Sequence, residues 1–405
     1  MVESLYLHIP FCVRRCRYCD FSTAATCRGD ELVGAYERSL ERLVSELVGL
    51  GLLAGVRTGY VGGGTPTMLG HELLGSLLGH VVSATSPAEL TFEANPESLG
   101  EDVLLAAREA GATRVSIGVQ SFDDRELEAL GRVHDAALAR RRVSEAVASG
   151  LRTSVDLMCG IPCQTAESWR RSLGEAVALG VGHVSCYPLT IEPGTAMERM
   201  CEAGELPWPS DDTEADDMEA AELLLGAAGL SRYEVASYAR PGECCRHNVA
   251  YWTGVEYVGL GTSAASMLGR RSYDSLRAAV PSLPEPAADA ARLRLTVTSS
   301  AREVAAARGL RDLRFDVEQL TGREAVAEDL MLAARTTDGI PAELVCLGRR
   351  VIGQDSVDAC LGELLERGLL RARPDGSFAP THAGWLLGNE LYGPLWDLAE
   401  AEGGR

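Results

Sequence analysis

The sequence lacks lysine altogether, so all 38 of its basic residues are arginines. A Walker A phosphate loop, a protein kinase and a pyridoxal phosphate enzyme each depend on a particular lysine, and these three classes are therefore excluded. Basic charge is also scarce overall, because the 405 residues carry a net charge of −20. Nucleic-acid binding needs a basic face, so the charge argues against a nucleic-acid partner.

Long apolar segments are missing as well. No run of about 18 apolar residues is present, which argues against a membrane span, and Cys12 follows the N-terminal Met too closely for a signal peptide. The 12 cysteines are too scattered, in a chain of this length, for a disulfide-stapled secreted scaffold. These features predict a cytoplasmic protein whose cysteines serve metal or redox chemistry.

The first half of the chain alternates strand-like segments with amphipathic helices, which predicts a parallel α/β structure. The six expected strands are Ser4–Ile9, Thr58–Val61, Glu89–Glu93, Arg114–Val119, Thr153–Leu157 and His183–Leu189. Each strand alternates an apolar side with a polar side, as Leu5 and Leu7 do against Tyr6. A closed eight-stranded barrel is filled with bulky apolar residues. A polar inner face therefore predicts a partial barrel around a polar ligand, with a solvated sheet face as the alternative.

The composition changes after Ser275, where three prolines punctuate an Ala-rich stretch. We expect a main domain over residues 1–275, a linker over 276–295 and a smaller domain over 296–405. Two helical patterns, a Pro-Asp-Gly turn between short strands and a last helix make this smaller domain mainly helical and winged-helix-like. A winged helix suggests DNA binding, but the acidic charge favours a packing domain or lid.

Cys12, Cys16 and Cys19 form the pattern CxxxCxxC. Three closely spaced thiolates suit a four-iron cluster in which each cysteine binds one iron. The remaining iron would then be open to chelation by a small molecule through an amine and a carboxylate. A zinc site is the alternative, but structural zinc takes four ligands, and the next cysteine, Cys27, lies farther along the chain.

Three glycines, Gly62, Gly63 and Gly64, directly follow the second expected strand and precede Thr65 and Pro66. Glycine lets the backbone approach a ligand closely and leaves its N–H and C=O groups accessible. The spacing does not match the dinucleotide-binding GxGxxG pattern. A plain tight turn is the alternative, and the glycines alone do not decide between the two.

Taken together, these motifs resemble the radical S-adenosylmethionine (SAM) superfamily, and within it the HemN/HemW family of oxygen-independent coproporphyrinogen III oxidase-like proteins. The resemblance is carried by GGGTP and by motifs that begin at Tyr6, Phe92, Gly118, Gly131 and Asp156. It covers nearly the whole chain. The family implies a partial (β/α)6 TIM-like barrel, a [4Fe-4S] cluster on the three cysteines, and SAM on the open iron, where electron transfer cleaves it to methionine and a deoxyadenosyl radical.

The resemblance also implies roles for single residues. Positions that match contacts to the cluster-bound SAM are Tyr6, Gly63, Gly64, Thr65 and Glu93. The coproporphyrinogen III dehydrogenase of this family holds a second SAM, and the positions that match its contacts are Gln120, Arg132 and Asp156. Ala265 aligns with a further contact, made by the backbone. Taken without the family, Arg132 would be a solvated charge at a helix end and Asp156 a helix cap.

Two departures from the dehydrogenase pattern favour the HemW branch of the family. The dehydrogenase has a fourth cysteine two positions after the third, where this chain has Phe21, and a long extension before the Tyr-x-His-Ile-Pro motif. The segment from His247 to Trp252 matches HNxxYW, which marks the HemW branch and is linked there to heme binding. Imidazole is a common ligand of heme iron, and Tyr and Trp rings offer flat apolar surface.

The leading hypothesis is therefore a heme chaperone that binds heme, a [4Fe-4S] cluster and SAM, and delivers heme to heme-accepting apoproteins. His247 is the candidate heme ligand, with Cys244 and Cys245 as alternatives and Arg240 and Arg246 as candidate partners of the propionates. A satisfied structural histidine is the alternative interpretation of His247.

Coproporphyrinogen III dehydrogenation and radical methyl transfer are the alternative functions, so enzymatic activity stays open, although Phe21 disfavours coproporphyrinogen oxidation. An electron donor is a further expected partner. A homodimer and a peripheral contact with a membrane stay open.

Overall fold

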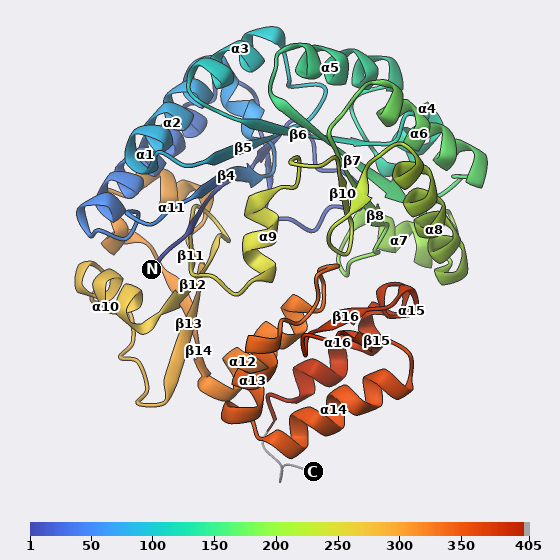
Figure 1. Ribbon diagram of the computed structural model, residues 1–405. Coiled ribbons are helices and arrows are strands. Elements are labelled where there is room, and N and C mark those ends of the chain that lie inside the picture. Colours follow the sequence, from blue (N-terminus) through green and yellow to red (C-terminus); the bar gives the residue numbers. More distant parts are fainter. Residues whose placement is uncertain (401–405) are drawn as a thin grey trace.

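One twelve-stranded sheet organises most of the chain in the computed structural model, which describes residues 1–400 (Figure 1). Its strands, in chain order, are β1 (Ser4–Ile9), β4 (Thr58–Gly63), β5 (Glu89–Ala94), β6 (Arg114–Gln120), β7 (Arg152–Cys159), β8 (His183–Pro188), β9 (Ser231–Arg232), β10 (Ser237–Ala239), β11 (Tyr257–Leu260), β12 (Ala265–Gly269), β13 (Ala290–Val297) and β14 (Phe315–Thr321). The six strands expected from the sequence correspond to β1, β4, β5, β6, β7 and β8, so this prediction is confirmed.

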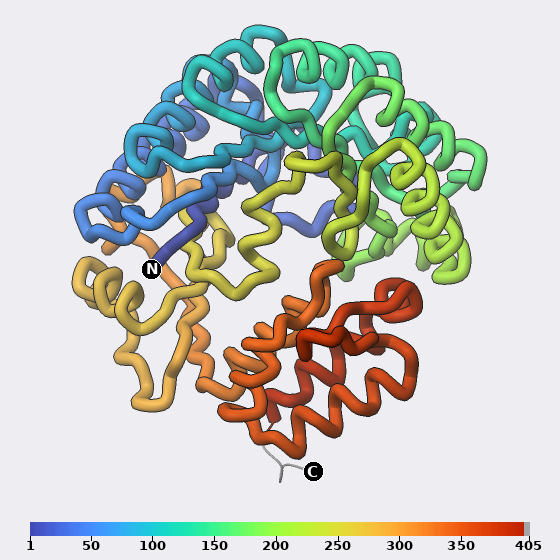
Figure 2. The backbone as a smooth tube through the Cα atoms, in the orientation of Figure 1, coloured from blue at the N-terminus to red at the C-terminus, as the bar shows by residue number. Residues whose placement is uncertain are grey.

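The strands lie in the order β14-β13-β12-β11-β1-β4-β5-β6-β7-β8-β10-β9. From β11 to β8 each strand runs parallel to its neighbours, and the strands outside this segment pair antiparallel. Among the described strands, β14 and β9 at the two ends do not pair with each other, so the sheet curves without closing (Figure 2). The partial barrel predicted from the sequence is therefore confirmed.

Helices follow the parallel strands, and most of them cover the outer face of the curved sheet (Figure 1). They are α1 (Glu31–Gly49), α2 (Gly70–Thr85), α3 (Glu101–Glu109), α4 (Asp124–Leu130), α5 (Ala136–Ala148), α6 (Ala166–Ala178), α7 (Ala196–Glu202) and α8 (Asp211–Ala227). α1 shows why they form there. The Asp30 side chain caps its first turn by accepting the N–H of Leu32, and Leu40 and Leu43 are fully buried in the main apolar core. Helical spacing of apolar residues thus directs one side of α1 onto the sheet.

Four shorter elements complete the region around the parallel strands. β2 (Phe11–Cys12) and β3 (Ala24–Ala25) pair in parallel and hold the two ends of the loop that carries the cysteine motif. The 3-10 helix η1 (Pro66–Leu69) follows the glycine run. α9 (Arg246–Trp252) lies within the curve of the sheet and contacts β4 (Figure 1).

The remainder of the described chain extends the sheet and then builds a second apolar core. Its helices and short strands are α10 (Arg270–Ala279), α11 (Ala301–Ala306), η2 (Leu310–Asp312), α12 (Gly322–Ala333), α13 (Ala342–Val351), α14 (Gln354–Glu366), β15 (Leu370–Ala372), β16 (Phe378–Pro380), α15 (His382–Leu386) and α16 (Gly388–Asp397). The β15–β16 hairpin stands between helices, as a winged-helix pattern requires. The predicted domain boundaries stay a prediction; β13 and β14 belong to the main sheet, and the second core draws on residues from Val326 to Ala399.

Pairs of charged side chains connect β13 to α12 and to β14. Arg292 donates to both carboxylate oxygens of Asp329, at 2.5 and 2.6 Å, and Arg294 pairs with Glu318 and Glu328. None of the helices between residues 1 and 400 combines the length and the apolar character needed to cross a membrane.

Candidate functional site

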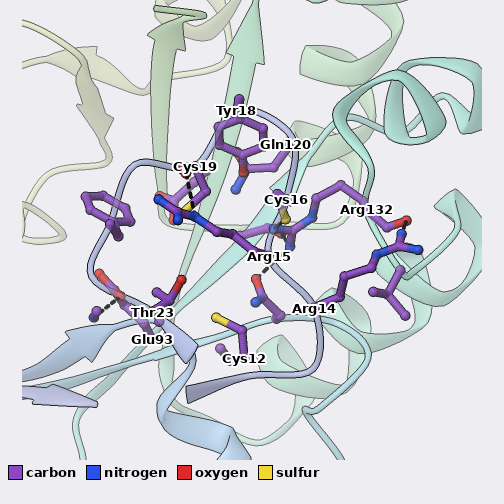
Figure 3. A pocket seen from close by; sticks show the side chains of 18 of the residues that line it. Cys12, Arg14, Arg15, Cys16, Tyr18, Cys19, Thr23, Glu93, Gln120 and Arg132 are labelled. Carbon is purple, nitrogen blue, oxygen red and sulfur yellow. Dashed lines mark hydrogen bonds between the residues drawn. The ribbon is translucent and has the colours of Figure 1, made fainter. Parts of the chain in front are cut away.

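A cavity of about 330 Å³ lies over the inner face of the sheet, toward the carboxyl ends of β4, β5 and β6 (Figure 3). Its wall includes most of the residues that the sequence singled out, namely Cys12, Cys16, Cys19, Gly63, Gly64, Glu93, Gln120, Arg132 and Asp156. Ser116 and Tyr187 join them, so the polar strand sides predicted from the sequence face this cavity. We call it the cysteine cavity. Ligand sites lie at the carboxyl ends of parallel strands in open α/β sheets, which is where this cavity lies.

The three cysteines stand around one space, with Glu93 and Arg132 on opposite sides of it in this view (Figure 3). Within residues 1–400, no three His, Cys, Asp or Glu side chains converge as ligands of a single metal ion. A four-iron cluster requires a different arrangement, because each thiolate binds a different iron. The partly buried sulfurs of Cys12, Cys16 and Cys19 around a common cavity fit that requirement.

Burial favours the protonated thiol at Cys12 and Cys19. It raises the pKa of the Cys12 thiol to about 11, against the lowering effect of the Thr65 hydroxyl 3.4 Å away, and it also raises the pKa of Cys19. Metal ligands must be thiolates, so binding iron at this site would release protons.

The cysteine loop is held by hydrogen bonds from its backbone and from the Arg14 side chain. The N–H of Arg17 donates to Leu130 O at 3.0 Å, and the Arg14 guanidinium donates to Gly131 O at 2.8 Å. At the end of the loop the N–H of Thr26 donates to Cys12 O at 2.9 Å. The first two contacts attach the loop to the end of α4 and the turn that follows it, and the third joins the two ends of the loop.

The glycine run lies directly against the strand that leads into Cys12. Gly64 N donates to Ile9 O at 2.8 Å, and a Cβ at Gly64 would stand 2.9 Å from Phe11 O. Gly63 has a φ of +111° and packs on the His8 ring. The glycines therefore lie close to the backbone of the segment before Cys12, and they also line the cavity.

Glu93 is the main acidic group beside the glycine run. Its carboxylate accepts the Tyr60 hydroxyl at 2.7 Å and the N–H of Gly63 at 3.0 Å. Burial raises its pKa to about 7, and the charge of Asp156 adds to the effect. Burial likewise raises the pKa of Asp156 to about 6, where the Ser116 hydroxyl lies 3.3 Å from both carboxylate oxygens. Two carboxyl groups with raised pKa values facing one cavity are typical of a functional site.

Arg132 reaches across the cavity from the turn after α4. Its guanidinium donates to Cys16 Sγ at 3.4 Å, and to Asn95 Oδ1 and Gly118 O at 2.6 Å each. Gln120 lies nearby with a φ of +68°, a left-handed backbone conformation that is uncommon outside glycine. Strained positions of this kind cluster at ligand-binding sites.

Three of the sequence-predicted residues are placed differently. Tyr6 and Ala265 are not among the residues that line the cysteine cavity. The Tyr6 hydroxyl lies 3.0 Å from His8 Nδ1, and Ala265 begins β12, on the far side of β11 from β1. Thr65 is buried behind the wall and contacts two residues that line the cavity, Cys12 and Asn95.

His247 is enclosed between α9 and the sheet. Its side chain is 1% exposed, Nδ1 lies 3.1 Å from the Thr58 hydroxyl, and its ring stacks on Tyr60 at 4.9 Å. Burial lowers its pKa to about 3, so the imidazole is neutral, and Nε2 is buried without a hydrogen-bond partner. A neutral imidazole with one fixed nitrogen and one free nitrogen has the electronic form of a metal ligand, but a metal can reach Nε2 only if the surrounding side chains move.

The rest of the HNxxYW segment faces a second cavity, also of about 330 Å³. Asn248, Tyr251 and Trp252 of α9 line one side of it, and Glu328 and Leu332 of α12 line another. The proposed propionate partners lie elsewhere: Arg240 donates to Ala228 O at 3.1 Å and Arg246 is exposed. Cys245 is buried beside Glu89, whose carboxylate accepts the N–H of His247 at 3.1 Å.

Sequence reasoning assigned no role to Asn95, Tyr18 or Met158, which also line the cysteine cavity. Asn95 stands in the Phe-Glu-Ala-Asn-Pro motif directly after β5. Its position at the end of a parallel strand is the feature that indicates a site residue. Tyr18 lies between Cys16 and Cys19 in the sequence, so the motif itself places it at the site.

An open α/β barrel with a CxxxCxxC loop over its strand ends is the arrangement of radical SAM proteins, and the family model described as the Radical SAM superfamily matches residues 6–176. Membership of this superfamily implies a [4Fe-4S] cluster and SAM. A Bacillus subtilis (strain 168) protein named heme chaperone HemW is 30% identical over 401 residues, which cover 97% of this chain and 98% of that protein. The chain belongs to the HemW family.

Other relatives agree. The heme chaperone HemW of Mycobacterium tuberculosis (strain ATCC 25618 / H37Rv) is 42% identical over 275 residues, 65% of this chain and 69% of that protein. The HemW of Escherichia coli (strain K12) is 39% identical over 267 residues, 64% and 69% of the two chains. Among solved structures, the coproporphyrinogen III oxidase HemN of Escherichia coli superposes with a TM-score of 0.76 at 22% identity, covering 97% of this chain and 90% of that one. This last likeness shows the fold alone.

Proposed function

We propose that this protein binds heme and delivers it to heme-requiring proteins, and that its cysteine cavity holds a [4Fe-4S] cluster and SAM. The match with a protein named heme chaperone HemW along 97% of the chain carries this proposal. Phe21 supports it, because this exposed ring lines the cavity at the position where the dehydrogenase pattern has a fourth cysteine.

In this proposal Cys12, Cys16 and Cys19 hold the cluster, and the open iron takes SAM. When bound, the cluster supplies one-electron chemistry to SAM. Gly63, Gly64 and Glu93 contact SAM in this proposal. Glu93 is held in place by the Tyr60 hydroxyl and the N–H of Gly63, which both donate to its carboxylate. Because Glu93 and Asp156 face the cavity, we expect its acidic side to orient the cationic groups of SAM.

Heme is assigned to the HNxxYW segment. Tyr251 and Trp252 give the second cavity flat apolar walls suited to a porphyrin ring. His247 has its Nδ1 beside Thr58, which leaves Nε2 for iron. Since Nε2 is buried, ligation by His247 requires α9 to shift, and we expect heme binding to be slow and to change the exposure of this helix.

The test is a titration of the purified protein with hemin, followed by absorbance. We expect a saturable Soret shift that weakens several-fold in His247→Ala. His183→Ala is the matched control, because His183 is equally buried, its pKa is also lowered to about 3 by burial, and it lies on β8. If the wild-type protein shows no saturable Soret shift, the proposal of heme binding is wrong. If the shift is equally weak in both variants, the assignment of heme to His247 is wrong.

Delivery and enzymatic activity are tested separately. The heme-loaded protein should transfer heme to an apo-hemoprotein, detected by the acceptor's spectrum after separation of the two proteins. Under anaerobic conditions, the protein with cluster, SAM and reductant should leave coproporphyrinogen III unchanged. Clear turnover to protoporphyrinogen would instead favour the dehydrogenase alternative.

A further inference from the structure

A chain of hydrogen bonds links Cys12 to Cys16 through side chains of the cavity wall. Arg132 donates to Cys16 Sγ at 3.4 Å and, from its other terminal nitrogen, to Asn95 Oδ1 at 2.6 Å. Asn95 Nδ2 donates to Thr65 Oγ1 at 2.8 Å, and that oxygen lies 3.4 Å from Cys12 Sγ. Asn95 is therefore the central member, with one sulfur at each end.

The chemistry of the groups fixes the direction of every bond in this chain. A guanidinium only donates, so it is the amide oxygen of Asn95 that faces Arg132 and the amide nitrogen that faces Thr65. The Thr65 hydroxyl accepts from Asn95, and its own proton is then free for Cys12. Both sulfurs consequently face a donor, although one donor is a cation and the other a neutral hydroxyl.

The side chain of Asn95 is not what holds the local fold. The turn after β5 is closed by its backbone carbonyl, which accepts the N–H groups of Ser98 at 3.0 Å and Leu99 at 3.1 Å. Arg132 has an independent hold on Gly118 O. Thr65 is 2% exposed and has no room to rotate into solvent. The amide of Asn95 therefore acts mainly on the orientation of two donors.

We propose that Asn95 is a positioning residue that aims the Thr65 hydroxyl and the Arg132 guanidinium at two cluster sulfurs and thereby raises the reduction potential of the cluster. Hydrogen bonds to cluster sulfurs are one of the determinants of that potential. A donor stabilises the reduced cluster more than the oxidised one, because reduction adds negative charge to the sulfurs. The inference rests on the proposed assignment of Cys12 and Cys16 as cluster ligands.

The test measures the midpoint potential of the anaerobically reconstituted protein by a redox titration followed by EPR. Asn95→Ala and Thr65→Val should each make the potential more negative, by about tenfold in the reduction equilibrium or about 59 mV for one electron. Asn95→Asp should shift it at least as far, because a carboxylate accepts the Thr65 proton and adds negative charge. Thr65→Ser keeps the hydroxyl and should restore the wild-type potential.

Thr67→Val is the matched control. Thr67 is as buried as Thr65, but its hydroxyl faces the Ser98 hydroxyl rather than a sulfur, so this variant should titrate like the wild type. Wild-type potentials in both Asn95→Ala and Thr65→Val, at full iron content, would overturn the proposal. Full iron content in Cys12→Ala or Cys16→Ala would instead show that the ligand assignment is at fault.

A second measurement applies where a variant does not retain its cluster. In the wild-type protein, exchange into D2O should remove proton couplings from the ENDOR spectrum of the reduced cluster, and Thr65→Ser should show the same loss. A spectrum without exchangeable couplings would also overturn the proposal, because no hydroxyl or guanidinium proton would then face the cluster sulfurs.

Discussion

Alanine in place of Gly64 should damage the cysteine cavity by steric conflict alone. The added Cβ would stand 2.9 Å from Phe11 O and 3.0 Å from both Ile9 O and Phe11 N. These are backbone atoms of the segment that leads into Cys12, so no side chain can rotate to make room. Either the glycine run or the start of the cysteine loop has to move.

The size of the effect follows from two contributions. Over-packing of a tight interior costs about 1–3 kcal/mol. Moving the loop also weakens the hydrogen bond from Gly64 N to Ile9 O, now 2.8 Å long, which contributes about 1 kcal/mol. We therefore expect Gly64→Ala to lower the free energy of unfolding by roughly 2–4 kcal/mol.

Gly79 provides the matched control. It lies inside α2, and a Cβ there would meet nothing within 4 Å. Alanine is favoured over glycine inside a helix by about 0.5–1 kcal/mol, so Gly79→Ala should raise stability slightly. Urea unfolding followed by circular dichroism measures both variants, and iron content after reconstitution reports on the cysteine loop. If Gly64→Ala is as stable as Gly79→Ala and takes up the full iron content, the steric reasoning is wrong.

Two further predictions concern buried charges. Burial raises the pKa of Glu93 to about 7, so the stabilising contribution of its protonated form is fully present below its unfolded-state pKa of about 4.3 and is lost as the pH rises through 7. Glu93→Gln should remove roughly 3 kcal/mol of this pH dependence, measured as the difference between the urea midpoints at pH 5 and pH 8. The same difference in both proteins would contradict the prediction. Arg292→Ala leaves the partly buried carboxylate of Asp329 without its partner, which costs about 1.5–3 kcal/mol for hydrogen bonds to a charged group. We expect earlier urea unfolding and faster proteolysis near α12, whereas Arg314→Ala, in an exposed pair with Glu303, should change neither.

The fold was predictable because its signals are local and repeated. Each parallel strand alternates apolar and polar residues, and α1 repeats apolar residues at helical spacing, as Leu40 and Leu43 show. β13 and β14 were not expected, because most of β13 falls in the stretch 276–295 that was interpreted as a linker. Both strands join the sheet by antiparallel pairing, β13 with β12 and β14 with β13. Their sequences carry charges such as Arg292 and Arg294, whose partners on α12 cannot be known until the chain is folded.

The site was predictable to the extent that its residues lie in short motifs. The cysteines, the glycine run and Glu93 were found together because β1, β4 and β5 are neighbours in the sheet as well as early in the chain. The surroundings of His247 were not predictable, since Thr58 and Tyr60 belong to β4, far away in the sequence. The motif identified the residue, but only the fold shows that its imidazole is enclosed.

The lack of lysine also bears on the chemistry of the cavity. Arg132 bonds Cys16, Asn95 and Gly118 at once, from two terminal nitrogens of one planar group. A lysine ammonium is a single point with three freely rotating donors, and it cannot hold partners at both ends of a planar fork. Arg132 can therefore fix the geometry of its three acceptors together, which a lysine at this position could not do. The same choice suits Arg292, which meets both oxygens of Asp329. In a protein with net charge −20, these few arginines therefore act as structural connectors inside the molecule, rather than as a basic surface for nucleic acid.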